Sequence, residues 1–161
     1  MHIRPSTSAD FARLHAINQA STPGVGAVSE GELASLIGMS DLTVLAEHDG
    51  NVSGFILCLT EGTTYQSPNY LWCVVRYACF AYCDRIAVAP EARGRGLGEQ
   101  LYAAAFEHFA GRRAVLLCEV NLAPPNPGSL KFHERLGFRA VGEAWSDDRS
   151  KGVVYLEKRL T

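Results

Sequence analysis

The sequence lacks a basic excess, a long apolar run and paired cysteines. Its 161 residues include 15 basic and 17 acidic side chains, a formal net charge of −2. Such a balance argues against a general nucleic-acid binder, because these proteins usually carry an excess of Lys and Arg. No segment has the length of a membrane span or the pattern of a signal peptide. We therefore expect a cytoplasmic protein with neither nucleic acid nor a membrane as partner.

The cysteines are odd in number and form no CxxC pair, which disfavours both a disulfide framework and a zinc site. We expect no metal. Strand-like apolar surroundings are typical of reduced core thiols, and the five are Cys58, Cys73, Cys79, Cys83 and Cys118. Cys83 lies beside the site discussed below and stays open as a minor alternative nucleophile.

Apolar patterns predict one α+β domain over residues 1–161, in which helices flank a mixed, mostly antiparallel sheet. No repeat or linker divides the chain. Helices are expected at 7–20, 29–37, 94–110 and 129–137. Strands are expected at 2–7, 42–48, 52–59, 79–90, 114–120, 138–145 and 152–160. Residues 60–78 are harder to place, because Tyr, Trp and Val give them strand character while a Ser-Pro-Asn turn interrupts them.

The stretch "VAPEARGRGLGEQLY" at residues 88–102 joins an expected strand to an expected helix through three alternating glycines. The first turn of a helix has free N–H groups and partial positive charge, which suit a phosphate. Glycines let a ligand approach the backbone, and Arg93 and Arg95 add cationic donors. No lysine completes a P-loop, and GxGxG is not the GxGxxG of a dinucleotide-binding fold.

The loop does match the pattern Arg/Gln-x-x-Gly-x-Gly/Ala, with Arg93, Gly96 and Gly98 in the defining places. A second stretch, "NPGSLKFHERLGF" at 126–138, is similar to NxxAxxLYxxxGF. With both motifs in this order around one central strand, the chain closely resembles the GCN5-related N-acetyltransferase (GNAT) superfamily, in particular its bacterial members. The resemblance implies the element order β-α-α-β-β-β-α-β-α-β-β. It also implies acetyl transfer from acetyl-CoA to a primary amine, on a small molecule or a protein, in a ternary complex.

The resemblance also implies where acetyl-CoA binds. Backbone groups of Ile86, Ala87 and Val88 are expected to pair with the pantetheine arm. The amides expected to wrap the pyrophosphate belong to Arg93, Gly94, Arg95, Gly96, Leu97 and Gly98. Asn126 stands at the motif asparagine that contacts the CoA arm, and Phe132 is expected as a wall beside it.

Acetyl transfer requires a base for the amine and a proton donor for the departing thiolate. Glu119 is the leading base candidate, because a carboxylate in an otherwise apolar strand is costly unless it is partnered or used. It also resembles a glutamate of the ribosomal-protein N-terminal acetyltransferases, which serves as base there. The alternative for Glu119 is an ion pair with an arginine. Asp84 is the second candidate, with a structural ion pair to a neighbouring cation as its favoured alternative.

His133 occupies the place of the family's helix tyrosine, the general acid to the thiolate, and an imidazole can take that role. A core histidine bonded to a backbone carbonyl is the alternative. Tyr82 shares a face with Asp84 and could fill either role. The missing tyrosine also leaves open a catalytically inactive CoA-binding sensor or scaffold. An aromatic cluster is expected to line an acceptor pocket, fill the core or form a homodimer interface, and it comprises Tyr65, Tyr70, Trp72, Tyr77, Phe80 and Tyr82.

Overall fold

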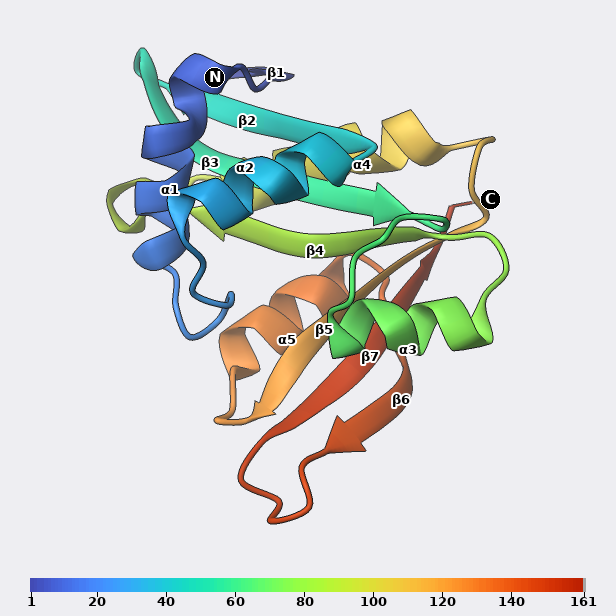
Figure 1. The fold of residues 1–161 in the computed structure, drawn as a ribbon. Coiled ribbons are helices and arrows are strands. Elements are labelled where there is room, and N and C mark those ends of the chain that lie inside the picture. The colour runs from blue at the N-terminus through green and yellow to red at the C-terminus, as the bar shows by residue number, and fades with distance from the viewer. Residues whose placement is uncertain (161) are drawn as a thin grey trace.

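Seven strands form one sheet in the order β1-β2-β3-β4-β5-β7-β6 in the computed structural model, which describes residues 1–160 (Figure 1). Only β4 and β5 are parallel neighbours, and the other pairs are antiparallel. The strands are β1 (His2–Pro5), β2 (Leu42–His48), β3 (Asn51–Thr60), β4 (Ala81–Val88), β5 (Val115–Ala123), β6 (Arg139–Trp145) and β7 (Gly152–Arg159). The predicted α+β fold with a mostly antiparallel sheet is confirmed.

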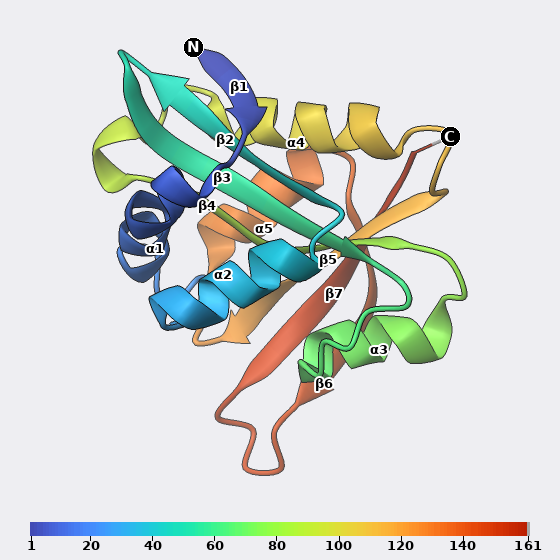
Figure 2. The ribbon, with the colours of Figure 1, turned by 45° about the horizontal axis from the view of Figure 1, so that its top comes forward.

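Helices cover both faces of this sheet. Helices α1, α2 and α3 lie over the face turned to the viewer in Figures 1 and 2, and α4 and α5 lie behind it. Within residues 1–160 the α-helices are α1 (Phe11–Gln19), α2 (Glu30–Met39), α3 (Pro68–Arg76), α4 (Leu97–Phe109) and α5 (Pro127–Arg135). No helix in this part of the chain is long and apolar enough to cross a membrane.

Helix α3 differs from the strand character expected for residues 60–78. Pro68 occupies the first helical turn, where its missing N–H costs nothing and its fixed φ favours the helix. Tyr70 and Cys73 are buried on one side of the helix, whereas Val75 is 80% exposed. Helical amphipathicity thus outweighs the intrinsic β preference of these residues. An additional helix therefore stands between β3 and β4.

The parallel strands β4 and β5 separate soon after they meet. They pair only at Ala81 with Leu116 and at Tyr82 with Leu117. Beyond that point β4 continues to Val88 while pairing with β3 alone. The other edge of β4 therefore presents backbone donors and acceptors that no strand uses, and such groups need a partner. The separation creates the opening in which the site lies.

The glycine loop at the end of β4 folds as the sequence predicts, although α4 begins at Leu97 and not at residue 94. Gly94 and Gly96 have φ of 76° and 79°. Side chains are strained in this left-handed region and glycine is not, so these two positions need glycine. The loop thereby turns sharply before the helix and directs free amides of the first turn outward.

Candidate functional site

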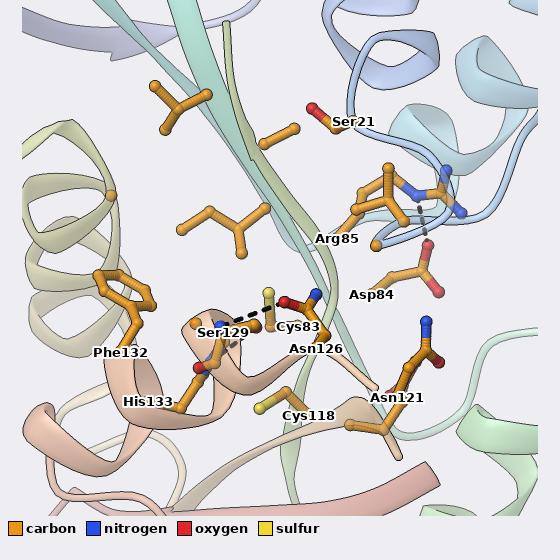
Figure 3. Close-up of a pocket in the computed structure, with 18 of the residues that line it drawn as sticks. Ser21, Cys83, Asp84, Arg85, Cys118, Asn121, Asn126, Ser129, Phe132 and His133 are labelled. Atoms are coloured by element: carbon orange, nitrogen blue, oxygen red, sulfur yellow. Dashed lines mark hydrogen bonds and ion pairs between the residues drawn. The ribbon is translucent and has the colours of Figure 1, made fainter. Parts of the chain in front are cut away.

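A cavity of about 1180 Å³ opens where β4 and β5 separate (Figure 3). Its walls are β4, the glycine loop, the end of β5, the first turns of α5 and the loop of residues 21–28. Most of the predicted site residues line it together: Asp84, Ile86, Ala87, Val88, Arg93, Gly94, Gly96, Leu97, Gly98, Glu119, Asn126, Phe132 and His133. Arg95 and Tyr82 do not line it.

The loop end of the cavity is shaped by close helix packing. A Cβ atom built on Gly98 would lie 3.0 Å from the Phe132 ring, so α4 approaches α5 closely only because residue 98 is glycine. Arg93 lies across the end of β4, where its Nε donates to the Val88 carbonyl at 3.1 Å and its Nη2 to Ser21 Oγ at 3.4 Å. Both contacts are exposed, so the guanidinium can reorient toward an anion at little cost.

Arg95 departs from the expected arrangement. Its Nη1 lies 3.1 Å from His48 Nε2, and its side chain lines a separate surface depression. In this structure its guanidinium therefore points away from the cavity, and the expected contact with the phosphates stays a prediction.

Asn126 has a visible structural role at the start of α5. Its side-chain oxygen accepts a hydrogen bond from the Ser129 amide at 3.3 Å, which caps the helix. The backbone N–H of Asn126 donates to the Asn121 carbonyl oxygen at 3.2 Å. These two bonds hold the side chain of Asn126 at the cavity wall.

Glu119 is held by neutral donors. Tyr82 Oη lies 2.8 Å and 3.0 Å from its two oxygens, and Asn69 Nδ2 donates to Oε1 at 3.1 Å. Tyr155 orients that amide by donating to Asn69 Oδ1 at 2.8 Å. Burial raises the pKa of Glu119 to about 8, although the hydrogen bonds from Tyr82 and Asn69 act in the opposite direction. Within residues 1–160 no arginine pairs with Glu119, so the ion-pair alternative is wrong.

This contact also corrects the expected role of Tyr82. Its side chain is fully buried, and its hydroxyl is engaged with Glu119 rather than facing the cavity. Tyr82 can therefore tune Glu119 but does not itself reach a ligand.

Asp84 forms an ion pair with Arg85, which was the expected alternative to a catalytic role for Asp84. Its Oδ2 lies 2.8 Å from Arg85 Nε, and the two side chains are 4% and 6% exposed. Neighbours in a regular strand point to opposite faces, but here the register shifts: Arg85 is opposite Leu57 while Cys83 is opposite Cys58. Asp84 is the extra residue of a β-bulge, which aims its side chain to the same side as Arg85. The regular alternation that would place Asp84 on the same face as Tyr82 is therefore interrupted at this residue.

His133 is a buried core histidine. Its Nδ1 lies 2.7 Å from the Ser129 carbonyl oxygen, which can only accept, so Nδ1 carries the proton. Its Nε2 lies 2.7 Å from Tyr102 Oη and, as the unprotonated nitrogen, accepts from that hydroxyl. Burial lowers the pKa of His133, which favours this neutral form. Nε2 then has no proton to donate to a thiolate, so this geometry disfavours His133 as the general acid.

Two residues that line the cavity were not predicted from the sequence. Tyr102 is fully buried and lines the cavity, and burial raises its pKa well above the ordinary value. It lies four residues after Gly98, on the same side of α4, and that spacing was the available signal. Asn69 belongs to α3, which the sequence analysis did not identify as a helix, so nothing in the pattern pointed to it.

The family described as "Acetyltransferase (GNAT) family" matches residues 11–138. A "Phosphinothricin N-acetyltransferase" of Streptomyces coelicolor is 42% identical over 57 residues, which are 35% of this chain and 33% of that protein. A "5-NmdU N-acetyltransferase" of Pseudomonas phage PaMx11 is 32% identical over 100 residues, 62% of this chain and 59% of that protein. These matches thus span less than two thirds of each relative.

Solved structures share the fold over nearly the whole chain. The ribosomal-protein-S18-alanine N-acetyltransferase from Escherichia coli superposes with a TM-score of 0.76 at 19% identity, covering 99% of this chain and 94% of that one. At this level of identity the likeness establishes the fold and leaves the substrate to be argued from the site.

Proposed function

Because the chain belongs to the acetyltransferase (GNAT) family, we propose that it transfers an acetyl group from acetyl-CoA to a primary amine. The amine attacks directly, with both substrates bound together. The observation that carries the proposal is the position of Glu119: a carboxyl group with a pKa of about 8 lines the same cavity as the glycine loop. A base is most effective when its pKa lies near the working pH.

The residues at the loop end fit acetyl-CoA, which supplies the thioester carbonyl. Gly94 and Gly96 turn the loop so that amides at the start of α4 are free for the pyrophosphate. The unpaired edge of β4 from Ile86 to Val88 can hold the amides of the pantetheine arm. The absence of a Cβ at Gly98 lets Phe132 form the adjoining wall.

Glu119 is proposed to accept the proton of the attacking amine. Tyr82 and Asn69 hydrogen-bond to its oxygens, and such bonds favour the charged form that a base requires. Without them, burial alone would hold the carboxyl protonated to a still higher pH. Tyr82 and Asn69 are therefore positioning residues, whereas Glu119 contacts the reacting nitrogen. Asp84 stays paired with Arg85 and removes no proton.

His133 is proposed as a positioning residue that fixes the Tyr102 hydroxyl. Tyr102 is a poor acid here, because its raised pKa lies above the value of about 8.5 that is typical of a thiol. Protonation of the leaving thiolate by this side chain would be unfavourable. We propose that CoA leaves as the thiolate and takes its proton from solvent. The missing family tyrosine then does not imply a missing step.

We also propose a homodimer and a cytoplasmic location. The apolar side chains Val74 and Val75 of α3 are exposed and support a homodimer, which analytical ultracentrifugation tests directly. The balanced charge supports a cytoplasmic protein whose partners are acetyl-CoA and an amine rather than nucleic acid or a membrane.

The proposal is tested by measuring CoA thiol release from acetyl-CoA with a panel of amines, together with a thermal-shift titration of acetyl-CoA alone. Acetyl-CoA is expected to raise the melting temperature, because it binds the folded state. Amine-dependent thiol release is expected for at least one acceptor. A melting shift without release from any amine would favour the alternative, a CoA-binding sensor or scaffold.

A further inference from the structure

The cavity reaches both faces of the sheet. The Tyr102–His133 contact joins α4 to α5 on one face. Glu119 bonds to Asn69 of α3, and Arg85 bonds to Asn18 of α1, on the other. In Figure 3 the Asp84–Arg85 pair and Phe132 accordingly lie on opposite sides of β4. If acetyl-CoA occupies the loop end, the acceptor amine approaches Glu119 from the face that carries Arg85.

The guanidinium of Arg85 is buried, but only two of its three nitrogens donate the hydrogen bonds described next. Its Nε donates to Asp84, and its Nη1 donates to Asn18 Oδ1 at 2.9 Å and to the Gly26 carbonyl at 3.1 Å. Within residues 1–160 Nη2 has no hydrogen bond of this kind, and no buried side-chain nitrogen or oxygen is left without a partner. Nη2 therefore reaches the cavity surface, since Arg85 lines the cavity.

The bulge at Asp84 explains why this charge faces the acceptor. It turns two neighbouring side chains of opposite charge to one side of β4, beside Tyr65. The pair is neutral in sum, and Glu119 is largely protonated at neutral pH. A fully cationic or fully anionic acceptor therefore finds no net complement here. A molecule that carries both an amine and an oxyanion does.

Neighbouring segments also narrow the acceptor end. The loop of residues 21–28 crosses it and is tied down from two sides: Arg85 donates to the Gly26 carbonyl, and Asn121 Nδ2 donates to the Pro23 carbonyl at 3.1 Å. Helix α3 borders a third side through Asn69, which lines the cavity. These segments narrow the space beside Arg85, which favours a small acceptor.

We infer that the acceptor is a small zwitterionic amine of the amino-acid type, whose carboxylate binds Arg85 Nη2 while its amine faces Glu119. The inference rests on the proposed acetyl transfer and names the class of its acceptor. Because Nε and Nη1 already donate to Asp84, Asn18 and Gly26, the N–H groups of Nη2 are the ones that can bind a carboxylate oxygen, and burial makes that charged contact specific. Arg85 is thus the specificity-determining residue, and the Tyr65 hydroxyl lies beside the Asp84–Arg85 pair and helps to orient it.

The test compares amino acids with their decarboxylated amines in wild type, Arg85→Lys and Tyr65→Phe. Wild type is expected to prefer the amino acid by about tenfold or more in kcat/KM. Arg85→Lys should reduce that preference, because it should raise KM for the amino acid by a larger factor than KM for the amine. Tyr65→Phe keeps the loop contacts and should reduce the same preference about threefold, a typical loss for one hydrogen bond.

Arg112→Lys is the matched control, because this exposed arginine pairs with Asp41 and does not line the cavity. It should change the rate with neither acceptor. Equal or higher rates with the decarboxylated amines would overturn the inference, as would an equal loss for both acceptors in Arg85→Lys. If no amine releases CoA thiol, the proposed function fails separately. Calorimetry with CoA-loaded protein then still tests Arg85: binding of the amino acid but not of the amine is expected, and no difference between them would overturn it.

Discussion

Replacing Glu119 by Gln removes one titration from the cavity and changes little else. The amide has the same shape, and its oxygen can still accept from Tyr82 and Asn69. The carboxyl of the wild type has an ordinary pKa of 4.5 in the unfolded chain and about 8 in the folded protein. The folded state therefore holds this proton to higher pH than the unfolded state does.

The sign of the stability effect follows from that difference. Between pH 4.5 and pH 8 the folded protein binds more protons at Glu119 than the unfolded chain, so this residue lowers the stability as pH rises. Integrating the two titrations gives a loss of about 3.5 kcal/mol from pH 5 to pH 8. Glu119→Gln should lack this loss. Its stability relative to wild type should therefore increase by about that amount over the same interval, as measured by urea unfolding at each pH.

The same titration governs activity. Below pH 8 the ionised fraction of Glu119 falls about tenfold per pH unit, and kcat/KM should fall with it. The acceptor amine also titrates, so the profile is measured with two acceptors of different amine pKa. A fall in rate whose midpoint pH is the same for both acceptors reports a group of the enzyme. Glu119→Gln should abolish that limb and reduce kcat by about 10²- to 10⁴-fold.

Tyr82→Phe is the control for this assignment. It removes a hydrogen bond that favours the ionised carboxylate, so the acceptor-independent limb should move to higher pH. A limb that stays in place in both variants would refute the role of Glu119 as base. Equal pH dependence of stability in wild type and Glu119→Gln would refute its raised pKa.

Three further variants test other parts of the site. Gly98→Ala should weaken acetyl-CoA binding about tenfold in calorimetry because the new methyl group displaces Phe132, whereas Gly38→Ala, where a Cβ meets nothing within 4 Å, should leave it unchanged. His133→Phe leaves the buried Tyr102 hydroxyl without its acceptor and should cost about 1–3 kcal/mol of stability, with the shape of the pH–rate profile retained; a lost limb would restore His133 as an acid. Cys83→Ser should keep amine-dependent turnover, and complete loss would instead favour an acetyl-Cys intermediate.

The sequence predicted those parts of the site that are encoded locally. Gly94 and Gly96 adopt a left-handed backbone, which their alternation after a strand and before a helix indicates. The helix cap at Asn126 was not predicted, because the expected helix began at residue 129. Family resemblance and backbone chemistry agree at the two glycines.

Features that depend on distant partners were not predictable. The neutral state of His133 requires the Ser129 carbonyl and the Tyr102 hydroxyl on two different helices. The bulge at Asp84 arises from the register with β3, which no local pattern reveals. Helix α3 was hidden because its aromatic and β-branched residues favour strands by intrinsic propensity, while burial of one face selects the helix.

The most direct test of acetyl transfer is a single quantitative assay with acetyl-CoA and an amino-acid acceptor between pH 6 and pH 9. Released CoA thiol and acetylated amine are measured together, in wild type and in Glu119→Gln. The account predicts equal amounts of the two products, a rate that rises to a plateau above pH 8, and a large loss in the variant. Acetyl-CoA that binds without amine-dependent thiol release, or turnover that Glu119→Gln leaves intact, would contradict it.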